Sequence, residues 1–190
     1  MKKHLTVQNI TKMALMAALL CMAAYISIPI GSVPITLQTL IINLTALILA
    51  PFEAFFAVLV YILLGLVGLP VFAGGTAGPG KLFGPTGGYI LAFLISAPII
   101  SILKESLLKF FGKISKSDNK KIMRIICYIL ATVMGMIVMY AIGTVYMKYM
   151  LDQTLMETLA VAVIPFIGLD LIKCILATII ALILEKALKR

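Results

Sequence analysis

The sequence is poor in charged residues and contains a single histidine. Charged residues make up 12% of its 190 positions, against about 25% in an average soluble domain. The one histidine is His4, near the N-terminus, so a Ser–His–Asp catalytic set cannot be assembled, and no carboxylate dyad is evident. The sequence therefore argues against a hydrolase or a metalloenzyme, and we expect neither a metal ion nor a cofactor.

Cysteine and phosphate-binding motifs are equally scarce. Cys21, Cys127 and Cys174 are odd in number, lie in apolar segments and lack metal-ligand spacing, which favours free buried thiols. The segment GKLF, at residues 80–83, lacks the Gly-Lys-Ser/Thr pattern of a phosphate loop that opens a helix after a strand. Any use of ATP is therefore expected to reside in partner subunits.

Apolar side chains, in contrast, dominate the sequence. Hydrophobic residues account for 63% of it and the mean hydropathy is +1.17, values typical of an integral membrane protein. Six apolar spans, separated by proline, glycine or charge clusters, lie near residues 11–28, 35–51, 53–70, 88–111, 122–147 and 159–185. They predict an all-α bundle of six transmembrane helices in a single domain, residues 1–190. The first span lacks an A-x-A-like cleavage site and is expected to be a retained helix rather than a signal peptide.

The basic residues are distributed asymmetrically. An even number of helices places both termini on one side of the membrane, and assigning that side to the cytoplasm collects all but three of the 16 basic residues there. The exceptions are Lys81, Lys148 and Lys173. The segment near 112–121 becomes a basic cytoplasmic loop. The net charge of +9 then indicates topology and attraction to anionic lipid head groups, rather than a surface for nucleic acid.

Two charged residues interrupt the last apolar span. Asp170 and Lys173 lie i,i+3 apart, so they share one face of a helix and can pair. An ionisable residue at such depth costs about 2.5–3.5 kcal/mol on insertion scales and normally faces the bundle interior or a cavity. A binding cavity with one anion, one cation and apolar walls is predicted. The alternative is a self-satisfied pair that only holds helices together.

Two further features concern the outer loop and the first span. The loop over residues 70–88 is rich in glycine, so its backbone can approach a ligand closely or serve only as a flexible connector. Ala14, Ala17 and Ala18 cluster in the first span, and Ala14 with Ala18 forms a small-xxx-small pair. Such a pair indicates either close docking of another helix or internal packing.

Three sequence blocks resemble one family. VPITLQTL (33–40), GLVGLPVFAGGTAGPGKLFGPTGGYILAF (65–93) and PFIGLDLIKCILA (165–177) resemble BioY, the biotin-specific substrate-binding component of energy-coupling-factor (ECF) vitamin transporters. The likeness covers nearly the whole chain. It departs at IGLDLIK, where many relatives read more like LPGDLIK. It also departs at residues 75–77, Gly-Thr-Ala, where relatives often carry a polar residue.

The resemblance implies high-affinity biotin capture and uptake across the cytoplasmic membrane by an ECF-type ABC transporter. Its partners would be biotin, a transmembrane coupling protein, two ATPase subunits and membrane lipids, with Ala14, Ala17 and Ala18 docking the coupling protein. The alternatives are a binding subunit for another water-soluble vitamin and a non-transport membrane scaffold.

The resemblance also implies a site. Asp170 is expected to accept a ureido N–H of biotin, and Lys173 to donate to a ligand oxygen or to keep Asp170 ionised. Further hydrogen-bonding, aromatic and loop residues are expected around this pair: Gln38, Thr36, Tyr89, Phe72, Gly75, Lys81, Phe83, Gly87 and Gly88. Thr36 could instead cap a helix, Tyr89 could be a membrane-interface aromatic, and Phe72 and Phe83 could be anchors.

Overall fold

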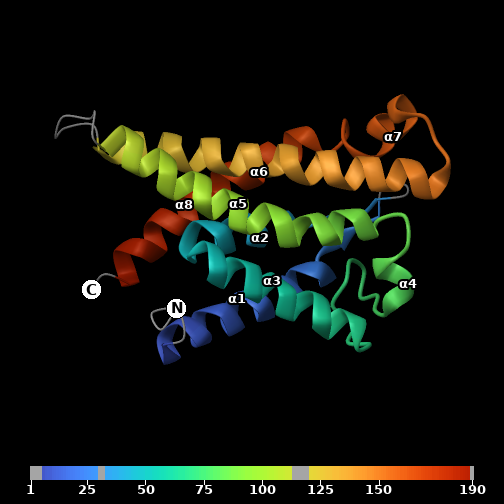
Figure 1. Ribbon diagram of the computed structural model, residues 1–190, viewed down its shortest axis with the longest axis horizontal. Coiled ribbons are helices and arrows are strands. Elements are labelled where there is room, and N and C mark those ends of the chain that lie inside the picture. Colours follow the sequence, from blue (N-terminus) through green and yellow to red (C-terminus); the bar gives the residue numbers. More distant parts are fainter. Residues whose placement is uncertain (1–5, 30–32, 113–119, 189–190) are drawn as a thin grey trace.

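The computed structural model of the chain describes residues 6–29, 33–112 and 120–188 and is mostly helical (Figure 1). Its elements, in chain order, are α1 (Val7–Tyr25), β1 (Ser27–Ile28), β2 (Ile35–Thr36), α2 (Gln38–Ile48), α3 (Pro51–Leu66), α4 (Pro79–Leu82), α5 (Gly87–Gly112), α6 (Lys120–Leu151), α7 (Leu155–Ala162) and α8 (Ile167–Leu188). The start of α1 and the end of α8 lie at the end of the bundle opposite α4. We call these the terminal end and the α4 end.

Four helices in the described ranges, α1, α5, α6 and α8, are long and apolar enough to cross a membrane. The apolar helices α2 and α3 are shorter, with 11 and 16 residues. The prediction of a helical membrane protein is therefore confirmed. Much of the predicted basic loop near 112–121, residues 113–119, lies outside the described residues.

The last predicted span, 159–185, is wrong as one continuous helix. The chain forms α7, then a break, and then α8. The cause is Pro165, which has no backbone N–H and cannot continue the hydrogen-bond ladder of a helix. Helix α7 is fixed at its start by Thr154, whose backbone N–H donates to Glu157 Oε2 over 2.8 Å. That hydrogen bond lowers the pKa of the Glu157 carboxyl below its usual value.

The break between α2 and α3 is stabilised by a buried lysine. Lys104 of α5 donates from Nζ to the main-chain carbonyls of Ala46, Leu47 and Leu49, over 3.1 to 3.2 Å. The last carbonyls of a helix have no partner within it, and a cation at this end also complements the helix dipole. A basic residue that sequence analysis counted for topology therefore also closes the C-terminal end of α2.

Helices α5 and α6 form the most extensive helix pair, and glycines allow their close contact. Gly135 of α6 faces Ile100, Gly143 of α6 faces the ring of Tyr89, and Gly88 of α5 faces Tyr146. At the terminal end, Arg124 of α6 forms an ion pair with Glu185 of α8, with 2.5 Å between Nη2 and Oε2. These contacts join α5, α6 and α8 into one side of the bundle.

The close contact at Gly88 is testable by replacement with alanine. A Cβ at this position would overlap the Cβ of Tyr146, which side-chain rotation cannot move. We expect Gly88→Ala to lower the unfolding free energy by about 1–3 kcal/mol, the usual cost of overpacking, as measured by thermal unfolding in detergent. Gly168→Ala is the matched control, because a Cβ there meets open space. Equal stability of the two variants would contradict this packing.

Candidate functional site

The break before α8 places Asp170 and Lys173 in the interior. The Asp170 backbone N–H donates to the carbonyl of Phe166 over 2.8 Å, in the first turn of α8, where a carboxylate is favoured by the helix dipole. Asp170 is 4% exposed and Lys173 is 8% exposed. Lys173 Nζ lies 2.8 Å from Asp170 Oδ1. The predicted ion pair is present and buried.

Two residues that sequence analysis missed complete this pair. Thr39 of α2 donates its hydroxyl to Asp170 Oδ1 over 2.9 Å and accepts from Lys173 Nζ over 3.0 Å. Tyr140 of α6 donates to Asp170 Oδ2 over 2.6 Å. In the sequence, Thr39 is notable only as a polar residue beside Gln38, and Tyr140 only as a tyrosine within an apolar span. We call Thr39, Tyr140, Asp170 and Lys173 the polar tetrad.

A cavity opens beside the polar tetrad, between α2, α5, α6 and α8. All four tetrad residues line it, together with four other predicted site residues: Thr36, Gln38, Lys81 and Tyr89. Its apolar walls include Ile90, Phe93, Met139 and Phe166. A space with one anion, two cations, several hydroxyls and apolar walls suits a small ligand that is polar at its ends and apolar between them.

Gln38 and Thr36 form a second polar group in the cavity. Gln38 Nε2 donates to the hydroxyl of Tyr61 over 2.5 Å, and its Oε1 accepts from the hydroxyl of Thr36 over 3.2 Å. Thr36 Oγ1 also accepts the backbone N–H of Gln38, over 3.3 Å. Thr36 thus binds the first residue of α2 and lines the cavity at the same time.

Tyr89 is buried in the bundle. Its ring packs against Gly143, and its hydroxyl lies 3.1 Å from the hydroxyl of Thr144. Because Tyr89 is 9% exposed and lines the cavity, its position does not fit the alternative of a membrane-interface aromatic.

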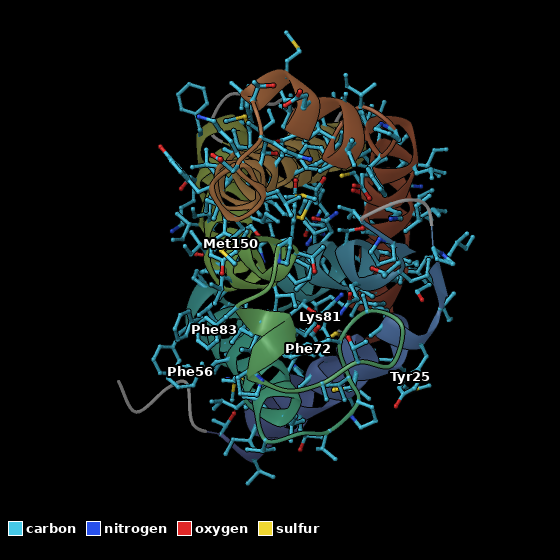
Figure 2. The ribbon with its side chains drawn as sticks, turned by 90° about the vertical axis from the view of Figure 1, so that its right-hand side faces the viewer. Tyr25, Phe56, Phe72, Lys81, Phe83 and Met150 are labelled. Carbon is cyan, nitrogen blue, oxygen red and sulfur yellow. The ribbon has the colours of Figure 1, made fainter. Side chains whose placement is uncertain are left out.

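Five predicted site residues are not among those that line the cavity: Phe72, Gly75, Phe83, Gly87 and Gly88. Phe72 is fully buried, and its ring makes a T-shaped contact with the ring of Tyr61 at a centroid distance of 5.8 Å. Phe83 is 60% exposed and points toward the edge of the α4 end, whereas Lys81 lies near its middle (Figure 2). The sequence pattern could not show where these side chains point, because their directions depend on how the loop folds back on itself.

The loop glycines make close contacts within the protein. Gly87 lies so near the carbonyl of Leu82 that any Cβ would overlap it, and Gly88 is close to Tyr146 in the same way. Gly75 has a φ of 71°, a left-handed conformation that glycine adopts without strain, and it packs near Tyr25. These contacts explain the glycines without an approach to a ligand.

The alanine cluster of α1 divides between two environments. Ala14 and Ala18 are exposed on the outer face of the helix, whereas Ala17 is buried. An apolar groove is lined by Ala14, Ile10, Met13 and residues of α3. The small-xxx-small pair therefore faces outward, and Ala17 belongs to the internal packing.

Fold and cavity together define the class: a helical membrane protein with a cavity of mixed polar and apolar lining between its helices. The family model described as the BioY family matches residues 1–190, and the chain belongs to the BioY family. It is 39% identical to biotin transporter BioY2 of Lactococcus lactis subsp. cremoris, over 95% of this chain and 91% of that one. It is 35% identical to biotin transporter BioY of Thermotoga maritima, over 94% and 96%.

Two solved structures share the fold. The crystal structure of the S-component for biotin from an ECF-type ABC transporter is similar with a TM-score of 0.82 and 30% identity, covering 98% of this chain and 95% of that one. A second S component of a bacterial ECF transporter has a TM-score of 0.54 and 16% identity, covering 96% and 95%. The second likeness concerns the fold alone.

The buried ion pair predicts a specific pattern of stability. Asp170→Asn or Lys173→Met leaves one charge without its partner, which costs about 3–5 kcal/mol in a protein interior. The double variant removes both charges and should recover most of this loss, as measured by thermal unfolding in detergent. Asp152→Asn, at an exposed position, is the control. Full stability of both single variants would contradict a buried, mutually dependent pair.

Proposed function

We propose that this chain captures biotin at the outer face of the cytoplasmic membrane, as the substrate-specific subunit of an ECF-type transporter. The observation that carries the proposal is the buried Asp170–Lys173 pair at the wall of a cavity between the helices, in a chain whose relatives are biotin transporters. A transport subunit of this kind needs no catalytic residues of its own. The protein is accordingly a binding subunit rather than an enzyme.

The cavity complements the chemistry of biotin. Its ureido ring carries N–H donors and a carbonyl acceptor, which match the Asp170 carboxylate and the Lys173 ammonium. The ring sulfur and aliphatic chain are apolar and match Ile90, Phe93 and Met139. The terminal carboxylate needs a cation. Within the described ranges Lys81 has no ion-pair partner, so it is the free charge that attracts this carboxylate.

The same proposal includes a topology. Helices α1, α2, α3, α5, α6 and α8 make six crossings of a single membrane domain, with both termini in the cytoplasm. Several large apolar side chains of α8 are exposed, among them Ile172, Ile175, Ile179 and Ile183, and these contact membrane lipids. The α4 end then faces outward, where the vitamin arrives.

Energy for uptake comes from partners in this proposal. The coupling protein docks on the outward face of α1 through Ala14 and Ala18, which are small enough to let another helix approach closely. Two ATPase subunits act through that coupling protein.

Radioligand binding to the purified protein tests the proposed substrate. We expect saturable binding of biotin and none of other water-soluble vitamins in a panel. We also expect Lys81→Met to weaken biotin about tenfold, or 1.4 kcal/mol, while hardly affecting biotinamide, whose tail is uncharged. Lys148→Met, on α6 outside the cavity lining, is the control.

Preference for another vitamin would replace biotin as the substrate. Absence of any vitamin binding by folded protein would refute capture itself. An equal loss for biotin and biotinamide would remove Lys81 from carboxylate recognition.

The docking face is tested separately from the cavity. We expect Ala14→Trp combined with Ala18→Trp to retain biotin binding but to stop uptake in cells that contain the ATPase and coupling subunits, because two indoles block helix approach. Ala17→Trp is the internal comparison, and it should lower folded yield because Ala17 is 2% exposed. If the outer pair of substitutions instead abolished binding, α1 would not be a docking surface.

A further inference from the structure

Hydrogen-bond capacity in the polar tetrad is largely used within the protein. An ionised carboxylate has about four lone-pair positions, and a lysine ammonium has three N–H donors. Asp170 Oδ1 accepts from Thr39 and from Lys173, while Oδ2 accepts from Tyr140. Lys173 donates to Asp170 and to Thr39. Among the described residues, this leaves one acceptor position on Asp170 Oδ2 and one donor on Lys173.

These two remaining positions are fixed in direction by Thr39 and Tyr140. The Asp170 carboxylate is held from both sides, by Thr39 of α2 at Oδ1 and by Tyr140 of α6 at Oδ2. It therefore cannot rotate without breaking a charge-assisted hydrogen bond. The ammonium of Lys173 is likewise tied to α2 through Thr39. The pair thus offers one acceptor and one donor near each other at the cavity wall.

An acceptor and a donor that lie side by side match a ligand with an N–H and a C=O on the same edge of its ring. In a cyclic urea the N–H and the neighbouring C=O point to the same side of the ring. The N–H can then donate to Asp170 Oδ2 while the C=O accepts from Lys173. A buried site that satisfies both groups strongly rejects a ligand that leaves one of them unpaired.

We propose that Tyr140 and Thr39 are positioning residues which make the Asp170–Lys173 pair read a single N–H/C=O edge of a cyclic urea. The inference rests on the proposed biotin function and deepens it. As in the proposed function, the ureido ring lies at the Asp170–Lys173 pair and the carboxylate tail on the Lys81 side of the cavity; the new element is the role of Tyr140 and Thr39. These polar groups do not recognise the sulfur ring.

Binding of biotin, desthiobiotin and 2-iminobiotin distinguishes recognition of this N–H/C=O edge from recognition of the rest of the molecule. Desthiobiotin keeps the cyclic urea but lacks the sulfur ring. In 2-iminobiotin a nitrogen replaces the ureido oxygen, and its protonated guanidinium form presents two N–H donors on this edge, one of which is set against the Lys173 ammonium. We expect the wild-type protein to lose more affinity, relative to biotin, for 2-iminobiotin than for desthiobiotin.

The test compares Tyr140→Phe with Tyr149→Phe, the same change at an exposed position of α6. Tyr140→Phe should weaken biotin about tenfold, the scale of a hydrogen bond to a charged group. The variant should also bring the affinities for biotin and 2-iminobiotin closer together. Without the Tyr140 hydroxyl, Asp170 Oδ2 has two free acceptor positions, which can take both donors of 2-iminobiotin. Tyr149→Phe should change neither. Thr39→Val should act like Tyr140→Phe, with Thr45→Val as its control, since the Thr45 hydroxyl bonds within its own helix.

The outcomes are distinct. A protein that binds biotin, but whose Tyr140→Phe and Thr39→Val variants lose all three ligands by the same factor, would show a merely structural role and overturn the inference. A wild-type preference for 2-iminobiotin over desthiobiotin would overturn it as well. Failure of the wild-type protein to bind biotin would instead refute the proposed function on which it rests.

Discussion

Two opposite charges buried in an apolar bundle impose the main constraint on this protein. Neither Asp170 nor Lys173 is stable alone at such depth, so each requires the other, and both require further hydrogen-bond partners. The structure supplies these partners from α2 and α6, through Thr39 and Tyr140. The ion pair therefore ties three helices together at the wall of the cavity, and in the proposed function the same contacts that satisfy the charges also orient them toward biotin.

Interrupted helices are the second constraint, because free main-chain groups are costly away from water. At the break after α2, the ammonium of Lys104 takes up three carbonyls. Before α8, the break at Pro165 sets the start of the helix and so places Asp170 in its first turn. A broken helix of this kind costs regular hydrogen bonds but directs a charged side chain into the interior. The break before α8 and the site itself thus have a common structural origin.

Much of the site was accessible from sequence because charge is conspicuous in an apolar span. Asp170 and Lys173 stood out by depth and spacing, and the structure pairs them in the cavity wall. Lys81, Gln38, Thr36 and Tyr89 also line the cavity. The glycine loop was harder to interpret, since a glycine that approaches a ligand and one that approaches protein look identical in sequence. Gly87 and Gly88 make the second kind of contact, with Leu82 and Tyr146.

The sequence by itself determined the class of the protein, its apolar spans and the buried charge pair, because hydropathy and helical spacing are local properties. The BioY resemblance was likewise carried by continuous blocks of residues. Only the tertiary structure decided which polar side chains meet Asp170. Thr39 is 131 residues away along the chain and Tyr140 is 30 away, and their meeting depends on how α2, α6 and α8 pack. Such packing follows from the fit of whole helix surfaces, which no local pattern contains.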